Sequence, residues 1–276
     1  MHLVVQSPRL SDADVAELLR FSTSGNSTRL AAGAVRIPGV APSAGIADYC
    51  NVRHFDFAYV PGERRLDRVG LVAMDMDSTL ITIECIDEIA DMQGIKPEVA
   101  TITASAMRGE IDFAESLRRR VGLLAGLDVA ALERVYDERL RLSPGAEAML
   151  AAFKAVGAKT MLVSGGFTFF TDRLQARLGL DYTASNVLEV SAGKLTGRVE
   201  GNIVDATVKA EAVRRRREDP GMINKLVVGI GDGANDLPML AAADVSVAYH
   251  AKPVVRERAT CQINYCSLDA VVNLFT

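Results

Sequence analysis

Leu71-Val72-Ala73-Met74-Asp75-Met76-Asp77-Ser78-Thr79 is the stretch around which the chain is organised. An apolar run of strand length stops at two carboxylates, as when a buried parallel strand delivers reactive groups to the carboxyl edge of an open α/β sheet. Residues two apart in extended backbone face the same side, so Asp75 and Asp77 address one substrate atom if the chain stays extended past Met74. Two carboxylates so close repel each other unless a cation or a proton lies between them. The pair therefore indicates either a hard metal ion or an acid and a base that work together. The alternative is a strand that ends in an ordinary polar turn.

The composition is typical of an ordinary soluble globular protein. The chain has 276 residues, 49% apolar and 24% charged, with a formal net charge of -4. This length allows one large domain with an insertion, or two domains. A basic run, Arg214 to Arg217, is followed at once by Glu218 and Asp219 and closes a predicted helix, where cations suit the carboxyl end. We therefore expect no nucleic-acid partner and no membrane partner.

The amino terminus and the cysteines indicate a cytoplasmic protein. Met1 to Leu10 lacks both the basic stretch and the apolar core of a signal peptide, and no run of eighteen apolar residues occurs. The cysteines are far apart or five positions apart, a spacing that implies neither a zinc site nor a disulfide framework. We expect buried thiols at Cys50, Cys85, Cys261 and Cys266.

The pattern in residues 1–67 predicts a small N-terminal α+β module. This module would either regulate the protein or form a homodimer. The expected elements are strands at His2–Gln6, Ala34–Ile37 and His54–Tyr59 and a helix at Asp12–Phe21, with turn-rich pieces at Ser22–Ser27 and Pro38–Gly45. Pro61 to Arg65 is polar and turn-prone, as expected of a linker before the Leu71 strand.

A helical cap is predicted at residues 85–142, because the next buried strand after Thr79 comes only near Lys159. A plain strand-helix-strand crossover needs far fewer residues. The helix signals are Asp112 followed by Glu115, Asp128 ahead of a helix at Val129–Leu140, and Ser143-Pro144 ahead of a helix that ends before Gly157. We expect this cap to lie over the carboxyl edge of the sheet as a lid.

Beyond the cap, strands alternate with helices. Strands are expected at Thr160–Val163, Leu226–Ile230, Val245–Ala248 and Cys261–Ile263, with a hairpin at Asn186–Val199 and helices ending at Gly179 or starting near Asp205, Leu237, Pro253 and Ser267. This alternation predicts an α/β fold with a doubly wound, mainly parallel sheet. The expected catalytic core is therefore residues 68–84 and 143–276, interrupted by the cap and preceded by the N-terminal module.

Two further stretches place small or charged groups where strands end or helices begin. Ser164-Gly165-Gly166 follows a strand and offers a hydroxyl and exposed amides just ahead of a helix, an arrangement that cradles an anion such as phosphate. Ser-Gly-Gly is also a common turn. Lys209 falls in the first turns of the helix from Asp205, where a cation is unfavourable without a nearby anion. Taken alone, Lys209 is better explained as a lysine that faces solvent.

A third stretch, Gly229 to Asp236, closes the strand that begins at Leu226. Its glycines allow close approach of the backbone, and Asp232, Asn235 and Asp236 supply the oxygen ligands that magnesium prefers. The order of these groups along the chain describes a magnesium site that binds a phosphate, with a carboxylate placed to attack it.

With these four stretches, the chain resembles the haloacid dehalogenase-like phosphatases, whose motifs read Asp-x-Asp-x-Thr, Ser/Thr, Lys and Gly-Asp-x-x-x-Asp. Within them it is similar to the phosphoserine phosphatase family, from about Gly70 onward. The segments that carry this likeness are Asp75–Leu80, Glu84–Ala90, Met107–Phe113, Ser116–Val121, Val163–Phe167 and Gly231–Asp236. The resemblance implies hydrolysis of O-phospho-L-serine to L-serine and inorganic phosphate, the last step of serine biosynthesis.

The resemblance also implies a role for each group at the sheet edge. Asp75 is the expected nucleophile, which forms an aspartyl-phosphate. Asp77 is expected to act first as the acid that protonates the leaving serine oxygen and then as the base that activates water. Mg²⁺ is assigned to Asp75, the backbone carbonyl of Asp77 and Asp232, with Thr79 and Asp236 in support. The phosphate oxygens are assigned to Ser164, Gly165, Lys209 and Asn235.

Recognition of an amino acid requires groups for an ammonium and a carboxylate. The resemblance offers Glu84 for the ammonium and Arg120, a planar fork able to make a bidentate pair, for the carboxylate. Met107 and Phe113 match positions that cover the substrate, although packing inside the cap explains them equally well.

Three alternatives stay open at this point. The aspartyl-phosphate could pass to another alcohol, as in a phosphotransferase. The substrate could be a different small phosphomonoester, although Glu84 and Arg120 argue against it. A catalytically inactive sensor is the least favoured, because it needs no combination of nucleophile, acid, lysine and metal carboxylates.

Overall fold

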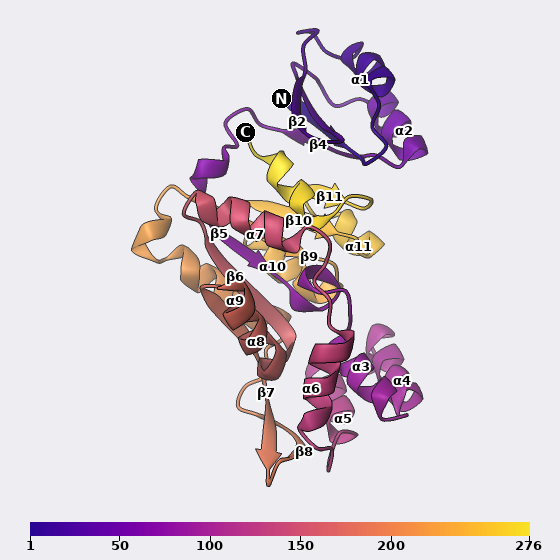
Figure 1. The fold of residues 1–276 in the computed structure, drawn as a ribbon, viewed down its shortest axis with the longest axis vertical. Coiled ribbons are helices and arrows are strands. Elements are labelled where there is room, and N and C mark those ends of the chain that lie inside the picture. The colour runs from indigo at the N-terminus through magenta and orange to yellow at the C-terminus, as the bar shows by residue number, and fades with distance from the viewer.

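The computed structural model describes residues 1–276 and contains two separate sheets (Figure 1). The larger has seven strands in the order β11-β10-β9-β5-β6-β7-β8. Its strands are β5 (Val69–Met74), β6 (Lys159–Phe167), β7 (Tyr182–Ser191), β8 (Lys194–Glu200), β9 (Leu226–Gly231), β10 (Val245–Tyr249) and β11 (Cys261–Ile263). All neighbouring pairs are parallel except β7 with β8. The expected mainly parallel α/β sheet is confirmed.

Strand β5 is central because both its faces are apolar. Val72 and Met74 pack into one hydrophobic cluster, and Leu71 and Ala73 pack into a second cluster on the opposite face. All six residues of the strand are buried. Helices cover both faces, which makes the sheet doubly wound. They are α7 (Ala146–Ala155) and α8 (Thr168–Leu178) on the first face, and α9 (Ala206–Arg217), α10 (Leu237–Ala241) and α11 (Pro253–Arg256) on the second.

The chain between β5 and β6 is helical, as the sequence predicts. It forms α3 (Cys85–Met92), α4 (Lys96–Met107), α5 (Phe113–Gly122) and α6 (Ala130–Arg134), which continues as a π-helical turn at Val135–Arg139. The Asp112 carboxylate accepts the Glu115 amide hydrogen at 2.7 Å, which confirms the predicted cap of α5. Figure 1 places these helices beyond the sheet, at the end opposite to the N-terminal strands.

Two backbone hydrogen bonds hold the segment that enters these helices next to the segment that leaves them. The Ser143 amide donates to the Leu80 carbonyl at 2.9 Å, and the Thr82 amide donates to the Arg141 carbonyl at 3.0 Å. The paired entry and exit are the expected geometry of an inserted cap. We keep the division at residues 84/85 and 142/143 as a proposal.

The antiparallel β7–β8 hairpin extends from the sheet and contacts the same helices (Figure 1). The Gly126 amide donates to the Leu195 carbonyl, and the Leu195 amide donates to the Leu127 carbonyl, both at 2.8 Å. The hairpin predicted at 186–199 is therefore present, and it holds the loop between α5 and α6.

The N-terminal residues form a four-stranded antiparallel sheet in the order β2-β3-β1-β4. Its elements are β1 (His2–Gln6), α1 (Asp12–Leu19), β2 (Thr28–Ala31), β3 (Ala34–Pro38), α2 (Ala44–Arg53) and β4 (Asp56–Val60). The sequence analysis missed α2 and β2. Ser43 caps α2 by accepting the Ile46 amide hydrogen, but only Ile46 and Cys50 in this helix are buried, so its apolar pattern is weak.

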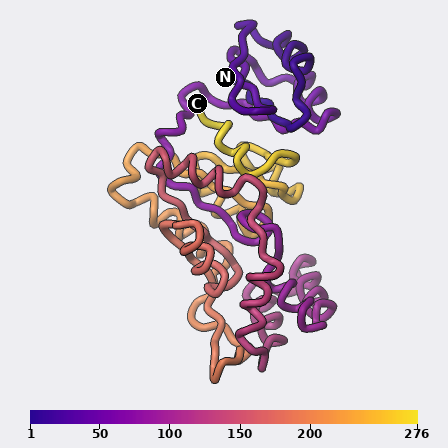
Figure 2. Tube along the Cα trace, viewed as in Figure 1, coloured from indigo at the N-terminus to yellow at the C-terminus, as the bar shows by residue number.

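The N-terminal sheet is anchored to the end of the chain. The buried Asp56 carboxylate accepts the amide hydrogens of Asn264, Tyr265 and Cys266 at 2.6, 3.0 and 2.8 Å. The linker includes a 3₁₀ turn at Leu66–Arg68. In Figure 2 the C-terminal segment lies between the N-terminal residues and the rest of the molecule.

A few expected boundaries were wrong. Strand β6 runs through Ser164-Gly165-Gly166 to Phe167, and only then does α8 begin, because both glycines stay within the strand. The final helix is a 3₁₀ helix, Leu268–Leu274, and the Ser267 hydroxyl donates to Asp269 and makes no cap to the backbone. Further 3₁₀ turns span Pro220–Met222 and Ala234–Asp236.

All four cysteines are buried free thiols, as expected. None of the helices combines the length and the apolar character needed to cross a bilayer.

Candidate active site

A cavity of about 670 Å³ lies at the carboxyl ends of β5, β6 and β9, under the cap helices. Most of the residues singled out in the sequence line it: Asp75, Asp77, Glu84, Met107, Phe113, Arg120, Gly165, Asp232 and Asn235. The remaining ones do not line the cavity and are fully buried: Thr79, Ser164, Lys209 and Asp236. The structure therefore brings the separate sequence motifs to a single site.

Lys209 is buried at the centre of this site and does not face solvent. Its Nζ donates to Asp75 Oδ1 at 2.6 Å and to Asp236 Oδ1 at 2.8 Å, and the residue is 1% exposed. Asp205 caps α9 by accepting the amide hydrogens of Thr207 and Val208, which fixes the first turn that carries Lys209. Burial lowers the pKa of Lys209, but the two carboxylates outweigh burial and hold this pKa above its ordinary value.

Asp75 has more negative charge around it than one lysine neutralises. Burial, followed by the Asp236 carboxylate, raises the pKa of Asp75 well above its ordinary value, and Lys209 opposes this shift. The two carboxylates share a single ammonium. A further cation would relieve this repulsion.

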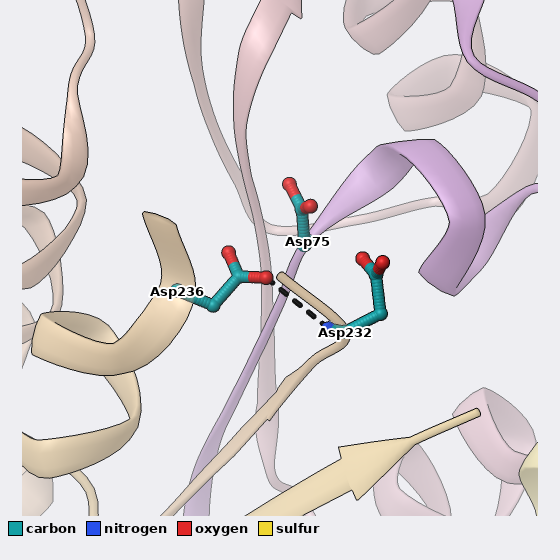
Figure 3. Close-up of side chains that lie close together, drawn as sticks. All are labelled: Asp75, Asp232 and Asp236. Atoms are coloured by element: carbon teal, nitrogen blue, oxygen red, sulfur yellow. Dashed lines mark hydrogen bonds between the residues drawn. The ribbon is translucent and has the colours of Figure 1, made fainter. Parts of the chain in front are cut away.

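Asp232 completes an acidic cluster with Asp75 and Asp236, whose carboxylate oxygens lie within 4.8 Å of one another (Figure 3). The Asp236 oxygens are already used, because Oδ1 accepts from Lys209 and Oδ2 accepts the amide hydrogens of Asp232 and Gly233. Figure 3 shows the carboxylates of Asp75 and Asp232 pointing to the same side. Burial, then repulsion from Asp236, raises the pKa of Asp232 to about 6.

This donor set fits a hard divalent cation, since it offers carboxylate oxygens from Asp75 and Asp232 and no nitrogen or sulfur ligand. Both Asp236 oxygens already accept hydrogen bonds, from Lys209 and from the amides of Asp232 and Gly233, so Asp236 orients its neighbours. Thr79 supports the cluster, because its hydroxyl donates to Asp232 Oδ1 at 3.3 Å.

Asp77 reaches the cavity from a wide turn, Met76–Leu80, and not from a continued strand. The condition that the chain stays extended past Met74 is met at Asp75 and not by the turn as a whole, in which Ser78 adopts a left-handed φ of 54°. Asp77 Oδ1 accepts the Cys85 amide hydrogen at 3.0 Å. Burial, then the Glu84 carboxylate, raises the pKa of Asp77 to about 7, which suits a group that gives and takes a proton at neutral pH.

Ser164, Gly165 and Gly166 form a tight backbone surface beside Asp77. The Ser164 hydroxyl accepts the Gly166 amide hydrogen at 2.8 Å. A Cβ at Gly165 would lie 2.8 Å from the Phe113 ring, and a Cβ at Gly166 would lie 3.0 Å from Asp77 Oδ2. Only glycine fits at these two positions without displacing a neighbour.

The cap and the residue just before it carry the groups expected to bind an amino acid. Glu84 Oε1 accepts a hydrogen bond from the Ser78 hydroxyl at 2.8 Å. Arg120 forms no salt bridge within the chain, and burial lowers its pKa despite the nearby Asp87, Glu84 and Asp77. Met107 is 69% exposed at the edge of the cavity.

Sequence reasoning missed Asn186, a buried residue of β7. Its Nδ2 donates to the Gly165 carbonyl at 2.8 Å and to the Gly166 carbonyl at 3.3 Å, and its Oδ1 accepts the Val204 amide hydrogen at 2.8 Å. Asn186 thereby ties the two glycines to the segment that precedes Lys209. An asparagine at the start of an apolar strand was the only available signal.

Lys252 was missed as well. It lines the cavity, and its amide donates to the Asp232 carbonyl at 3.0 Å. It follows β10, so the rule that polar residues after parallel strands gather at one edge would have found it.

Comparisons with known proteins agree with this site. The family model of the haloacid dehalogenase-like hydrolases matches residues 72–241. The phosphoserine phosphatase of Polaromonas sp. is 54% identical over 215 residues, which cover 76% of this chain and 91% of that protein.

Two solved structures are also similar. The probable phosphoserine phosphatase from Vibrio cholerae, in unliganded form, is 37% identical with a TM-score of 0.84, and the match covers 99% of this chain and 85% of that one. A substrate-bound phosphoserine phosphatase complex is 37% identical with a TM-score of 0.69, over 75% of this chain and 99% of that one. The chain therefore belongs to the haloacid dehalogenase-like hydrolases and, within them, to the phosphoserine phosphatases.

Proposed function

We propose that this protein is a magnesium-dependent phosphatase that hydrolyses O-phospho-L-serine to L-serine and inorganic phosphate, the last step of serine biosynthesis, in the cytoplasm. The observation that carries the proposal is a single cavity lined by a buried, lysine-paired carboxylate, Asp75, and by the unpaired arginine Arg120. The names of the relatives support the substrate.

Magnesium would be held by the carboxylates of Asp75 and Asp232 and by the backbone carbonyl of Asp77. When bound, the ion supplies positive charge that offsets the repulsion between a phosphate dianion and an attacking carboxylate. Asp236 and Thr79 support these ligands through the hydrogen bonds described above.

The chain's own residues would carry two chemical steps. An Asp75 carboxylate oxygen forms a bond to phosphorus while the bond from phosphorus to the serine oxygen breaks, and protonated Asp77 gives its proton to that oxygen. Asp77, now a carboxylate, takes a proton from water, and the water oxygen attacks phosphorus and releases Asp75 and inorganic phosphate. The pKa of Asp77, raised to about 7 by burial and Glu84, suits both roles.

Phosphate binding is assigned to Ser164, the Gly165 amide, Lys209 and Asn235. Lys209 also holds Asp75 in place. Glu84 would bind the substrate ammonium and Arg120 its carboxylate, each by charge-assisted hydrogen bonds. Phe113, which lies against Gly165, and Met107 would exclude water when the cap is closed.

The N-terminal residues 1–67 are proposed to form a separate module that mediates a homodimer or regulation. Strand β2 is an edge strand with mostly exposed residues, which leaves one side free to pair.

The test is release of inorganic phosphate from O-phospho-L-serine, with magnesium and after removal of divalent ions by a chelator. We expect magnesium-dependent turnover that phosphothreonine inhibits only weakly and that Asp75→Asn abolishes. Hydrolysis of other phosphomonoesters without hydrolysis of phosphoserine would support a phosphatase activity but refute the roles proposed for Glu84 and Arg120. Full turnover after chelation would refute the metal assignment.

A further inference from the structure

Ser116 lies on α5 in the wall of the cavity, and the catalytic account above gives it no role. The residue is 1% exposed. Its hydroxyl is buried and has no hydrogen-bond partner in the protein. A buried hydroxyl without a partner is unfavourable, so such an atom in a ligand cavity points to a partner that arrives with the ligand.

Hydroxyls on helices often bond to the carbonyl four residues earlier. Thr101 and Thr103 on α4 do so, donating to Pro97 and Val99 at 2.9 and 3.1 Å. The Ser116 hydroxyl makes no such bond, and the Asp112 carbonyl accepts only the Ser116 amide hydrogen, at 3.0 Å. The Ser116 hydroxyl therefore has no partner in the protein and is available to a ligand that enters the cavity.

Ser116 and Arg120 are one turn apart on the same face of α5. Arg120 Nε makes a weak contact with the Ser116 carbonyl at 3.4 Å, and no carboxylate of the chain pairs with the guanidinium. A hydroxyl donor and an unpaired guanidinium side by side favour a group with two acceptor oxygens and a negative charge. A carboxylate has this chemistry.

We propose that the Ser116 hydroxyl donates a hydrogen bond to the same substrate carboxylate that Arg120 binds, and so helps to select phosphorylated amino acids over phosphoesters that lack this group. The inference rests on the proposed function and names an additional residue for substrate specificity. Ser116 does not act on phosphorus, so its contribution depends on the carboxylate alone.

The test compares Ser116→Ala with the unsubstituted protein on O-phospho-L-serine and on O-phosphoethanolamine, which keeps the phosphate and ammonium but lacks the carboxylate. Loss of a hydrogen bond to a charged group raises KM for phosphoserine roughly tenfold with kcat nearly constant. KM for phosphoethanolamine changes less than twofold. The ratio of the two KM values is the readout, and a general loss of structure would not change it.

Thr103→Val is the matched control, because it removes a hydroxyl from the same wall that already donates to Val99. We expect it to leave the ratio of the two KM values the same. If Ser116→Ala does not fold, Ser116→Cys gives the same comparison with a side chain of similar shape and a weak donor.

Equal changes in KM for both substrates, or an unchanged KM for phosphoserine, would overturn this inference alone. If the unsubstituted protein hydrolyses no phosphoserine, the proposed function fails and the inference fails with it.

Discussion

At the scale of single residues, the direction of each carboxyl pKa shift depends on burial together with the partners of the carboxylate. Asp75, Asp77 and Asp232 have raised pKa values, in each case with burial as the largest cause. Asp181 lies away from the site, and its pKa is lowered from the ordinary value. The difference lies in the partners, because the site carboxylates face one another whereas Asp181 faces donors.

Asp181 provides a pH-dependent test of stability. Burial alone would raise its pKa, but hydrogen bonds from Lys159 and from the amide and hydroxyl of Thr160 hold the pKa below its ordinary value. A carboxyl with a lowered folded-state pKa stabilises the protein above its unfolded-state pKa, and this contribution is lost as the pH falls through the folded-state value. Asp181→Asn should therefore lower the free energy of unfolding at pH 6, and the difference should shrink below about pH 4.

Urea unfolding at several pH values measures this difference. Asp172→Asn, at an exposed aspartate of α8 whose carboxylate makes no hydrogen bond within the chain, is the control and should show no such trend. A constant difference between the Asp181 variant and the parent at all pH values would contradict the prediction.

At the scale of elements, the ends of strands and helices carry the site. The sequence predicted β5, the acidic turn after β9 and the helix that carries Lys209, because each has an apolar run or a cap that ends at a polar group. It did not predict that β6 continues through Gly165 and Gly166, since the hydrogen bonds that hold them there come from Asn186, a residue of another strand.

Other residues went unpredicted for the same reason, because their roles depend on groups that are distant in the sequence. Asn186 becomes meaningful only through partners that are distant in the sequence, and Ser116 only through the cavity that it lines. The buried position of Lys209 was likewise hidden, because its two carboxylate partners come from β5 and from the turn after β9. Local patterns fix where an element ends but not what it faces.

Asn186 gives the prediction at this scale. Asn186→Leu removes its hydrogen bonds with Gly165, Gly166 and Val204. We expect kcat/KM to fall on the order of 10- to 100-fold, because displacing the backbone that is proposed to bind phosphate by a fraction of an ångström misaligns the reactants. The loss should be the same for phosphoserine and phosphoethanolamine, unlike the loss in Ser116→Ala.

Steady-state kinetics on the two substrates check this prediction. Asn186→Asp keeps an acceptor for the Val204 amide but places a carboxylate oxygen against the Gly165 and Gly166 carbonyls, so it should restore neither the activity nor the stability of the parent. Full activity in Asn186→Leu would show that the strand holds the glycines without this side chain.

At the scale of the whole molecule, hydrogen bonds join the cap helices and the N-terminal sheet to the elements around the seven-stranded sheet. The cap helices are tied to the core at Leu80 and Ser143 and to the hairpin at Leu195. The N-terminal sheet is tied to the C-terminal segment through Asp56. The spacing of the predicted strands and the turn-prone stretch before Leu71 led to the proposed division into a core, a cap and an N-terminal module, whereas the contact through Asp56 joins residues more than 200 positions apart.

Asp56→Ala removes the acceptor of the amides of residues 264–266, of which the first two are partly buried and that of Cys266 is buried. We expect a loss of roughly 2 to 4 kcal/mol in unfolding free energy. Hydrogen exchange should show increased opening of β4 and of residues 264–266, with less change in β5 and β6. Asp48→Ala, at an exposed position on α2, is the control. Uniform exchange across the whole chain would contradict a local role for Asp56.

The central claim is that Asp75 attacks phosphorus and that Asp77 then activates water. The most direct measurement is a single turnover of Asp77→Asn with p-nitrophenyl phosphate and magnesium, because this leaving group needs no acid, whereas the second step needs the missing base. We predict a burst of one equivalent of p-nitrophenol and a phosphoryl group on the peptide that contains Asp75, identified by mass spectrometry. Nitrophenol release with no phosphorylated peptide, or with the phosphoryl group on another residue, would contradict the account.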